Sequence, residues 1–409
     1  MTKRVLLVLP AALLALASVV SCDARAATST TACDTPGVSS DQVRVGLVYP
    51  DTGTLSPTFT PLRAGLNARL GAVNAAGGVN GRKIEYDWAD DGARQDTNRV
   101  VTQDLVENKK EFAILEATAT ATGGAANLAA KGIPVVGVSA EPVWAEYQNM
   151  FTFSFAQVSL NSSDVVTTFG KFAQQRGGSR ALLLSDPLSS GQSSSTAQHL
   201  QGSLQAVGIP VTALVADQSP TQGQLNEIIR QITTNQADIL ASTLPVDTFA
   251  QIVATVRQRN LPLKVVLTAS VLPGNEVLAR YGSKIAGMTS FNVQALDVAS
   301  AGYIRYRTAM NRFAPELQDI NQDLARVGYV LGDMLVRGLQ TAGPCPTRQS
   351  FISGLRAVTN YTADGLVTPM NFEADFGRIP VCYPFIAINA AGNGVTTVTP
   401  DLCGERVAR

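Results

Sequence analysis

The side chains that could do chemistry fall near the ends of predicted strands, and most are hydroxyls or single carboxylates. Asp90 and Asp91 end one strand and could bind a metal ion. Without a third nearby carboxylate, capping of the following turn is the better interpretation. Glu116 and Glu141 form the one pair of acids that we find for glycoside hydrolysis, and separate loops would have to bring them together. We therefore predict no catalytic residue, no metal site and no cofactor.

The chain has a single histidine, His199, inside a predicted amphipathic helix and away from any strand-end loop. A lone histidine lacks the partners that catalysis or metal binding needs, so we interpret it as a surface or partly buried helix residue. Ser-His-Asp, Cys-His and histidine-based metal sites are excluded for the same reason. The sequence thus predicts a protein that is not an enzyme.

The first residues are typical of an export signal. Lys3 and Arg4 precede an apolar run, 5–20, that is shorter than the ~20 residues of a comfortable membrane span. Two processing sites compete, a lipobox that would place a lipid anchor on Cys22 and ordinary cleavage after Ala26. We favour the lipobox. The prediction is a signal over residues 1–26, a flexible leash over 27–41, and a protein at the cell surface or in the periplasm, anchored by lipid to the cell membrane.

Four other cysteines remain, namely Cys33, Cys345, Cys382 and Cys403. In an oxidising exported compartment an even number of cysteines favours disulfides, and four cysteines allow three pairings. A zinc site is disfavoured because no CxxC motif or histidine cluster accompanies them. We predict two disulfides with the pairing open.

Charge and composition narrow the class of partner. The 409 residues include 32 Lys plus Arg and 32 Asp plus Glu, so no basic surplus is available to neutralise nucleic-acid phosphates. Hydrophobic residues make up 45% of the chain, enough for a sizeable core. Nucleic acid is therefore not an expected partner.

Strands and helices alternate along the chain, which predicts parallel sheets covered by helices. We expect an α/β protein with two doubly wound parallel-sheet lobes joined by a hinge, and function in the strand-to-helix loops. The predicted lobe boundaries are 42–156 plus 286–343 for the first lobe and 157–285 plus 344–409 for the second. The predicted strands are 43–48, 83–88, 112–115, 134–138, 181–184, 211–215, 239–241, 265–267, 366–372 and 384–388. The predicted helices are 61–75, 98–107, 121–130, 164–175, 194–207, 224–235, 249–259, 304–313 and 324–341.

Residues 74–86 (NAAGGVNGRKIEY), followed by Asp90 and Asp91, resemble extracellular solute-binding proteins of ABC importers of the branched-chain amino-acid-binding type. The segment 46–57 resembles that family's first strand and ligand loop, and 132–136 resembles its fourth strand. The resemblance spans most of residues 43–156 and weakens beyond. It implies the type I periplasmic-binding-protein fold and an interlobe cleft that closes on a small solute.

The resemblance also implies ligand contacts in the first lobe. The family's small or hydroxyl residue after the third strand falls on Thr118, where an anion could sit on the following helix N-terminus. The family's Ala-x-Thr pair, which holds the carboxylate and ammonium of an amino acid, aligns with Ser139, Ala140 and Glu141. Glu141 puts a carboxylate where the family has a hydroxyl. It would repel an anionic group and attract a cationic or donor group.

The second lobe departs further from the family. The family's tyrosine aligns with Ser190, beside Ser189, and its ammonium-binding acid aligns with Ala269 or Ser270. Neither functional group is present, and loss of a buried counter-ion could cost about 3 to 5 kcal/mol. Plain branched-chain amino acids are therefore disfavoured.

Aromatic contacts are expected near Thr58 and Phe59, where the family's first-loop aromatic falls, and at Trp144. Three solutes stay open: one whose ammonium pairs with Glu141, a neutral solute such as an amide, and an aromatic acid stacked on Trp144. Each residue also has a structural interpretation, as a helix cap, a turn residue or core packing.

Three functions follow from these patterns. The preferred one is a monomeric receptor that binds a small-molecule solute unchanged and hands it to an ABC permease in the membrane. A ligand-sensing protein of the same fold is the alternative. An exported enzyme that uses Glu116 and Glu141 is the third.

Overall fold

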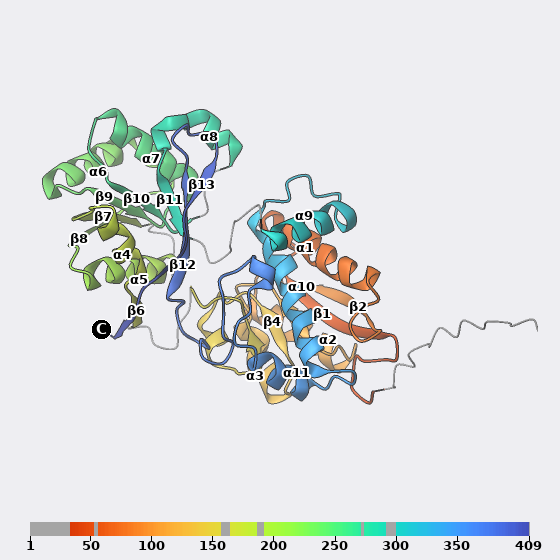
Figure 1. Ribbon diagram of the computed structural model, residues 1–409. Helices are drawn as coiled ribbons and strands as arrows, with labels where there is room; N and C mark the ends of the chain where they lie inside the picture. Colours follow the sequence, from red (N-terminus) through yellow and green to blue (C-terminus); the bar gives the residue numbers. More distant parts are fainter. Residues whose placement is uncertain are drawn as a thin grey trace, which may run out of the picture.

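The computed structural model describes two α/β lobes (Figure 1). The described residues are 33–52, 56–156, 164–185, 192–270, 274–291 and 300–408. The predicted export signal, the lipid anchor at Cys22 and the first part of the leash lie outside these ranges. Among the described residues no helix is long and apolar enough to cross a membrane.

A parallel five-stranded sheet forms the centre of the first lobe, in the order β2-β1-β3-β4-β5. Its central strands are buried on both faces, as parallel strands under crossover helices must be. The strands are β1 (Gln42–Tyr49), β2 (Lys83–Asp90), β3 (Ile114–Glu116), β4 (Val135–Gly137) and β5 (Met150–Phe151).

Eight helical segments belong to the described part of this lobe. Two of them, α1 and α10, pack closely enough that a Cβ on Gly65 would lie 1.7 Å from the Ala325 carbonyl oxygen, and one on Gly328 would lie 2.0 Å from that of Leu62. Glycine at both positions lets the two backbones approach. The segments are α1 (Ser56–Ala75), α2 (Gln95–Glu107), α3 (Thr122–Ala130), η1 (Pro142–Ala145), α9 (Ala301–Phe313), α10 (Asp323–Ala342), α11 (Arg348–Arg356) and η3 (Ala363–Gly365).

The second lobe holds a seven-stranded sheet in the order β13-β12-β11-β10-β9-β7-β8. Leu182 and Leu184 belong to one hydrophobic cluster and Leu183 to another, so successive residues of β7 face two separate cores. The strands are β7 (Ala181–Ser185), β8 (Val211–Val215), β9 (Ile239–Ser242), β10 (Val265–Thr268), β11 (Met288–Phe291), β12 (Cys382–Ile388) and β13 (Val395–Cys403). The helical segments are α4 (Thr168–Gln175), α5 (Gln192–Ala206), α6 (Gln222–Asn235), α7 (Val246–Gln258), α8 (Asn275–Tyr281) and η2 (Gly282–Ile285).

The two sheets repeat one topology. The parallel part of the second sheet has the order β8-β7-β9-β10-β11. If β7 is counted as the first strand of its lobe and β8 as the second, this matches the order β2-β1-β3-β4-β5 of the first sheet. Only β12 and β13, which pair antiparallel with their neighbours, are added at one edge. The prediction of two doubly wound lobes is therefore confirmed.

The structure differs from the predicted boundaries and from some predicted elements. Met288–Phe291 is part of the second sheet, whereas α11 and the segment 358–372 pack into the first-lobe core. The predicted helix over 164–175 begins as β6 (Asp164–Val166), which pairs with β14 (Arg406–Ala408). The predicted strand over 366–372 is irregular apart from one bridge, Tyr361 to Met370, because its apolar side chains fill a core outside any sheet. No sequence pattern predicted β13, whose residues are mostly exposed.

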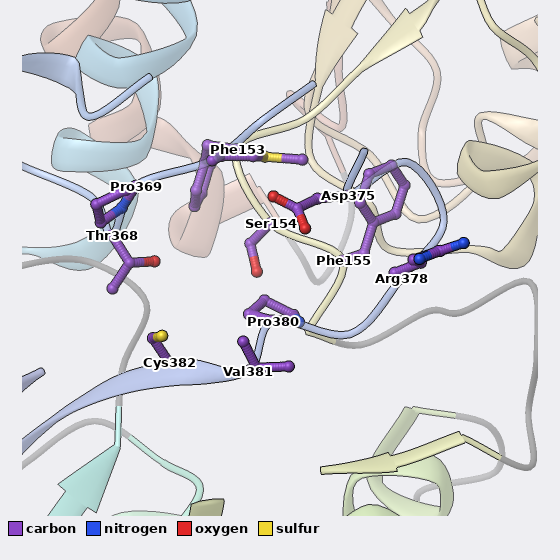
Figure 2. Close-up of a pocket in the computed structure, with 11 residues that line it drawn as sticks. Phe153, Ser154, Phe155, Thr368, Pro369, Asp375, Arg378, Pro380, Val381 and Cys382 are labelled. Carbon is purple, nitrogen blue, oxygen red and sulfur yellow. The ribbon is translucent and has the colours of Figure 1, made fainter. Parts of the chain in front are cut away.

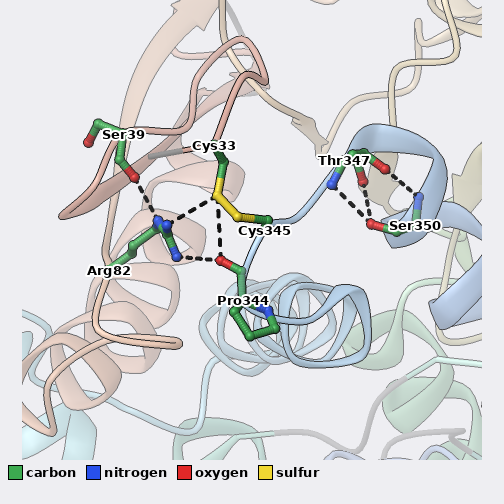
Figure 3. Close-up of a disulfide and its surroundings, with 7 residues drawn as sticks. All are labelled: Cys33, Ser39, Arg82, Pro344, Cys345, Thr347 and Ser350. Carbon is green, nitrogen blue, oxygen red and sulfur yellow. Dashed lines mark hydrogen bonds between the residues drawn. A yellow bond between two sulfur atoms is a disulfide. The ribbon is translucent and has the colours of Figure 1, made fainter. Parts of the chain in front are cut away.

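The four cysteines pair as Cys33–Cys345 and Cys382–Cys403. The first disulfide joins the start of the described chain to the turn after α10 (Figure 3). Arg82, 1% exposed, lies beside it and donates from Nε to the Ser39 carbonyl oxygen and from Nη1 to the Pro344 carbonyl oxygen, each at 2.6 Å. The predicted leash is thus fastened to the first lobe from Cys33 onward.

The second disulfide links opposite residues of β12 and β13, 21 positions apart. Replacing both Cys382 and Cys403 with serine should lower the free energy of unfolding by about 3 kcal/mol, because the unfolded chain regains the entropy of an open loop. Urea unfolding followed by circular dichroism measures the change. An unchanged midpoint in the double variant would contradict it.

Candidate functional site

Each lobe has a point where the strand order reverses, between β1 and β3 in the first lobe and between β7 and β9 in the second. In open α/β sheets the loops at the carboxyl ends of such strands diverge and leave a crevice for ligands. We call residues 49–52, 90–92, 116–122 and 139–141 the first-lobe rim. Residues 242–244, 268–270 and 290 are the second-lobe rim.

Asp90 holds two loops of the first-lobe rim together. Its Oδ1 accepts from the backbone N–H of Asp51 at 2.9 Å and of Gly92 at 2.8 Å, and its Oδ2 accepts from the Thr52 hydroxyl. Burial opposes the charge, but these hydrogen bonds outweigh it and hold the pKa of Asp90 below its ordinary value. Asp90 therefore works as a turn cap.

A chain of hydrogen bonds runs inward from Thr118. The Thr120 hydroxyl donates to Asp91 Oδ2 at 2.9 Å, so the 2.9 Å contact between the two threonine oxygens is donated by Thr118. Asn98 Nδ2, on α2, donates to Asp91 Oδ2 at 3.3 Å and to Glu116 Oε1 at 3.1 Å. The carboxylates of two strand ends are thus joined by one amide.

Glu116 is fully buried at the end of β3. Burial raises its pKa to about 8, the hydrogen bond from Asn98 opposes this, and the charges of Asp91 and Glu141 add to it. Among the described residues Glu116 Oε2 and Asn98 Oδ1 have no hydrogen-bond partner. Glu116 is therefore largely neutral at pH 7.

The loop after β4 brings Glu141 to the start of α3. Glu141 Oε2 accepts from the Thr122 backbone N–H at 3.0 Å, and Oε1 accepts from the Thr122 hydroxyl at 2.9 Å and from Gln95 Nε2 at 3.3 Å. The Ser139 hydroxyl donates to the Ser154 carbonyl oxygen. The carboxylate of Glu141 occupies the helix end where the sequence predicted a bound anion.

Other predicted contacts are placed differently. Trp144 is completely buried in the first-lobe core, where its ring lies over Gly137, so it packs against β4 rather than lining the rim. A Cβ on Gly137 would lie 2.4 Å from the Trp144 ring. Phe59, on α1, is partly buried against the same core. Thr58 lies in α1, and Ala140 follows Ser139 on the rim with its N–H bonded to the Val138 carbonyl oxygen at 2.8 Å.

The second-lobe rim joins three strand ends through hydroxyls. The Ser270 hydroxyl donates to the Leu244 carbonyl oxygen at 2.9 Å, and the Ser290 hydroxyl donates to the Ser270 carbonyl oxygen at 2.6 Å. Ser242 Oγ accepts from the Leu244 N–H at 3.0 Å. Ser189 and Ser190 lie outside the described residues.

Sequence reasoning missed Thr120, Ser242 and Ser290 on the rims and Asn98 behind the first-lobe rim. Ser242 and Ser290 come at or next to a strand's last residue, which was the available signal. Asn98 lies in the first turn of α2, and only the packing of that helix on the sheet brings its amide to Asp91 and Glu116.

The described crossing between the lobes is the segment from Phe376 to Ile379. Phe376 packs on the first-lobe core, with its ring 5.7 Å from that of Phe155, whereas Ile379 belongs to a core of the second lobe. Gly377, between them, has φ +63, a conformation that favours glycine. The turn of the chain from one lobe to the other is therefore at Gly377.

One ion pair spans this crossing. Arg406 Nη2, on β14, lies 3.2 Å from Asp375 Oδ1, and its Nε donates to the Ile379 carbonyl oxygen at 3.0 Å. Asp375 in turn accepts from the Asn371 N–H at 2.9 Å. Arg406 thus connects the second lobe to both sides of Gly377.

Figure 2 shows a small cavity at the same crossing, between 153–155 and 368–382. Its volume is about 60 Å³. Ligand pockets for small molecules are usually several times larger, roughly 300 Å³ or more. The cavity therefore belongs to the hinge and does not provide a solute site.

The predicted pair of acids, Glu116 and Glu141, is not arranged for glycoside hydrolysis. A catalytic acid must reach the substrate, and Glu116 has no exposed surface. Glu141 already accepts three hydrogen bonds from α2 and α3. This geometry gives the enzyme hypothesis no support.

The family model described as periplasmic binding protein matches residues 42–393. No curated protein matches the sequence. The chain therefore belongs to the periplasmic binding protein family, which is a family of binding proteins and not of enzymes.

Solved structures show the same fold at low identity. A candidate branched-chain amino acid ABC transporter from Rhodospirillum rubrum has a TM-score of 0.72 at 16% identity, covering 87% of this chain and 100% of its own. The fatty acid ABC transporter substrate-binding protein from Thermomonospora curvata has a TM-score of 0.66 at 17% identity, covering 91% of this chain and 95% of its own. The branched-chain amino acid transporter substrate binding protein LivJ from Streptococcus pneumoniae was solved in complex with isoleucine. It has a TM-score of 0.65 at 16% identity, covering 88% of this chain and 100% of its own. The predicted type I fold is confirmed.

Glu116 should make stability depend on pH. The unfolded residue loses its proton near 4.5 and the folded residue near 8, so the free energy of unfolding should fall as pH rises between these values. Relative to Glu116→Gln, the wild type should lose on the order of 5 kcal/mol across this range. Urea unfolding at several pH values measures it, with the exposed Glu146→Gln as control. A flat difference between wild type and Glu116→Gln would contradict the assignment.

Arg406 should protect the backbone amides of the crossing segment from exchange with solvent. Arg406→Gln should speed amide exchange across residues 377–383 about threefold, since a partly exposed ion pair contributes about 0.7 kcal/mol. Hydrogen–deuterium exchange by mass spectrometry measures this. The control is Arg378→Gln, which changes an exposed arginine on the same segment. Equal exchange in the two variants would show that the Asp375 pair has no such role.

Proposed function

We propose that this protein is an extracytoplasmic solute-binding receptor of an ABC importer. It captures one small polar solute between its lobes and delivers it unchanged to a permease in the membrane. The observation that carries the proposal is the repeated strand order, which gives each lobe a switch point ending in hydroxyl-bearing loops. Gly377, at the described crossing between the lobes, supports capture by lobe closure.

The similar structures support this reading through their descriptions. They include ABC transport proteins described for branched-chain amino acids and fatty acids, one of them in complex with isoleucine. Family membership places this chain among binding proteins of the same type. At identities of 16 to 17%, the solutes of these proteins do not identify the solute of this chain.

The contacts proposed for the solute come from both rims. In the first lobe they are Thr118, Ser139 and Glu141, and in the second lobe Ser270 with Ser189 and Ser190. Thr118 and Glu141 are brought together at α3, since Thr118 bonds to Thr120 and Glu141 bonds to Thr122. This proximity supports a shared site at the start of that helix.

The cellular setting is part of the proposal. The export signal and the lipid anchor at Cys22 would hold a monomeric receptor at the outer face of the cell membrane, near its permease. The fastening of the chain to the first lobe at Cys33 supports this arrangement, because it leaves only residues 23–32 as the leash. Fully extended, those residues reach about 35 Å.

Binding can be tested with a panel of amino acids, amides, amines and aromatic acids. A solute at 100 times its dissociation constant should raise the free energy of unfolding by ~2.7 kcal/mol, seen as a thermal shift. Small-angle scattering should show a smaller radius of gyration with solute, and mass spectrometry should recover the solute unaltered. A chemically changed solute, or a natively purified protein that neither carries nor binds any small molecule, would argue against a receptor.

Thr118 provides a site-specific test. Thr118→Val keeps the volume but removes the hydroxyl, so the affinity for the identified solute should fall about tenfold, the equivalent of ~1.4 kcal/mol. Thr359→Val, an exposed threonine of the same lobe, is the matched control. Calorimetry on both variants measures the dissociation constants. An equal affinity in the two would remove Thr118 from the site.

A further inference from the structure

The hydroxyls of the first-lobe rim already use their protons in hydrogen bonds within the protein. Thr118 donates to Thr120, which donates to Asp91, and Ser139 donates to the Ser154 carbonyl oxygen. A hydroxyl has one proton and two lone pairs, so each of these oxygens has only lone pairs left for a ligand. Turning the Thr118 proton outward would break its hydrogen bond to Thr120.

The charged group of this rim is also an acceptor. Glu141 lies on the N-terminus of α3, where the helix dipole and the free N–H groups favour an anion. Its carboxylate takes both the backbone N–H and the hydroxyl of Thr122. The anion-binding position at this helix N-terminus is therefore occupied by the protein's own Glu141 carboxylate.

The second-lobe rim is mixed in polarity. The Ser270 and Ser290 hydroxyls donate to carbonyl oxygens. Ser242 and Thr268 instead accept from backbone N–H groups, and Thr243 Oγ1 has no partner among the described residues, so these hydroxyls keep a proton for a ligand.

Two described arginines at this edge of the first lobe already have partners. Arg63 Nη1 donates to the Tyr49 hydroxyl oxygen of the rim at 3.3 Å, and its guanidinium lies 4.9 Å over the Trp88 ring. Arg94 Nη2 lies 2.9 Å from Asp96 Oδ2.

From the polarity of the first-lobe rim we infer the class of solute, an inference that rests on the proposed function. The solute is a neutral or cationic molecule that offers N–H donors, such as an amine, a guanidine or a primary amide, and it directs no free carboxylate at the first-lobe rim. Donors would meet the lone pairs of Thr118 and Ser139 and the carboxylate of Glu141. A carboxylate would meet like charge from Asp90 and Glu141 and oxygens without a proton to give.

The helix end can be tested without knowing the solute. Glu141→Ala should leave the anion-binding position at the N-terminus of α3 empty. Sodium acetate should then bind there and raise this variant's midpoint of thermal unfolding, with saturation below about 200 mM. Sodium chloride at equal ionic strength is the reference. The wild type and Glu146→Ala, which removes an exposed carboxylate from the same segment, should show no saturable rise. Equal acetate effects in all three proteins, or none in Glu141→Ala, would overturn the inference.

Matched solutes test the class directly. The pairs are leucine with leucinamide, benzoate with benzamide and 4-hydroxybenzoate with 4-hydroxybenzamide, measured by calorimetry on wild type and Glu141→Ala. In any pair that binds, the wild type should favour the amide at least tenfold, and Glu141→Ala should reduce this preference at least tenfold. A wild type that binds an acid more tightly than its amide would refute the class while leaving the receptor function standing. If no pair binds, the acetate result decides the inference and the wider solute panel decides the function.

Discussion

The constraint on which the rest of the molecule depends is the burial of parallel strands on both faces. Strands such as β9 and β10 have no exposed residue, so they carry no polar chemistry along their length. Polar side chains can then gather only where the strands end and the chain turns back into a helix. The switch points of both sheets concentrate these ends, which is why the candidate contacts of each lobe lie in a few short loops.

The polar groups gathered there must satisfy one another before they can serve a ligand. In the first lobe Asn98, Thr120 and the backbone N–H groups of 51, 92 and 93 bond to Asp90 and Asp91, and Thr122 with Gln95 bonds to Glu141. This internal pairing keeps a dense group of carboxyls stable. It also decides the polarity that the rim offers outward, because protons given inward are not available to a solute.

The hinge and the disulfides act at the lobe boundaries. Gly377 lets the chain turn between two anchored side chains, and Arg406 joins the segments on either side of it. The Cys382–Cys403 bond closes the end of the β12–β13 ribbon just before β14, the strand that carries Arg406. The Cys33–Cys345 bond and Arg82 fasten the other end of the chain to the first lobe. Each disulfide therefore ties one end of the described chain to its own lobe.

Much of this architecture was determined by the sequence alone. The alternation of apolar runs predicted most of the strands and helices, and the run 74–86 with Asp90 and Asp91 identified the family, because such local patterns depend on neighbours along the chain. The tertiary structure alone decided the disulfide pairing, the second-sheet position of Met288–Phe291 and the first-core position of 358–372. It alone placed Trp144 in the core, Asn98 between two carboxyls and Glu141 on α3. Those outcomes depend on which distant segments meet, and a side chain's hydrogen-bond partners are set by that meeting rather than by its own type.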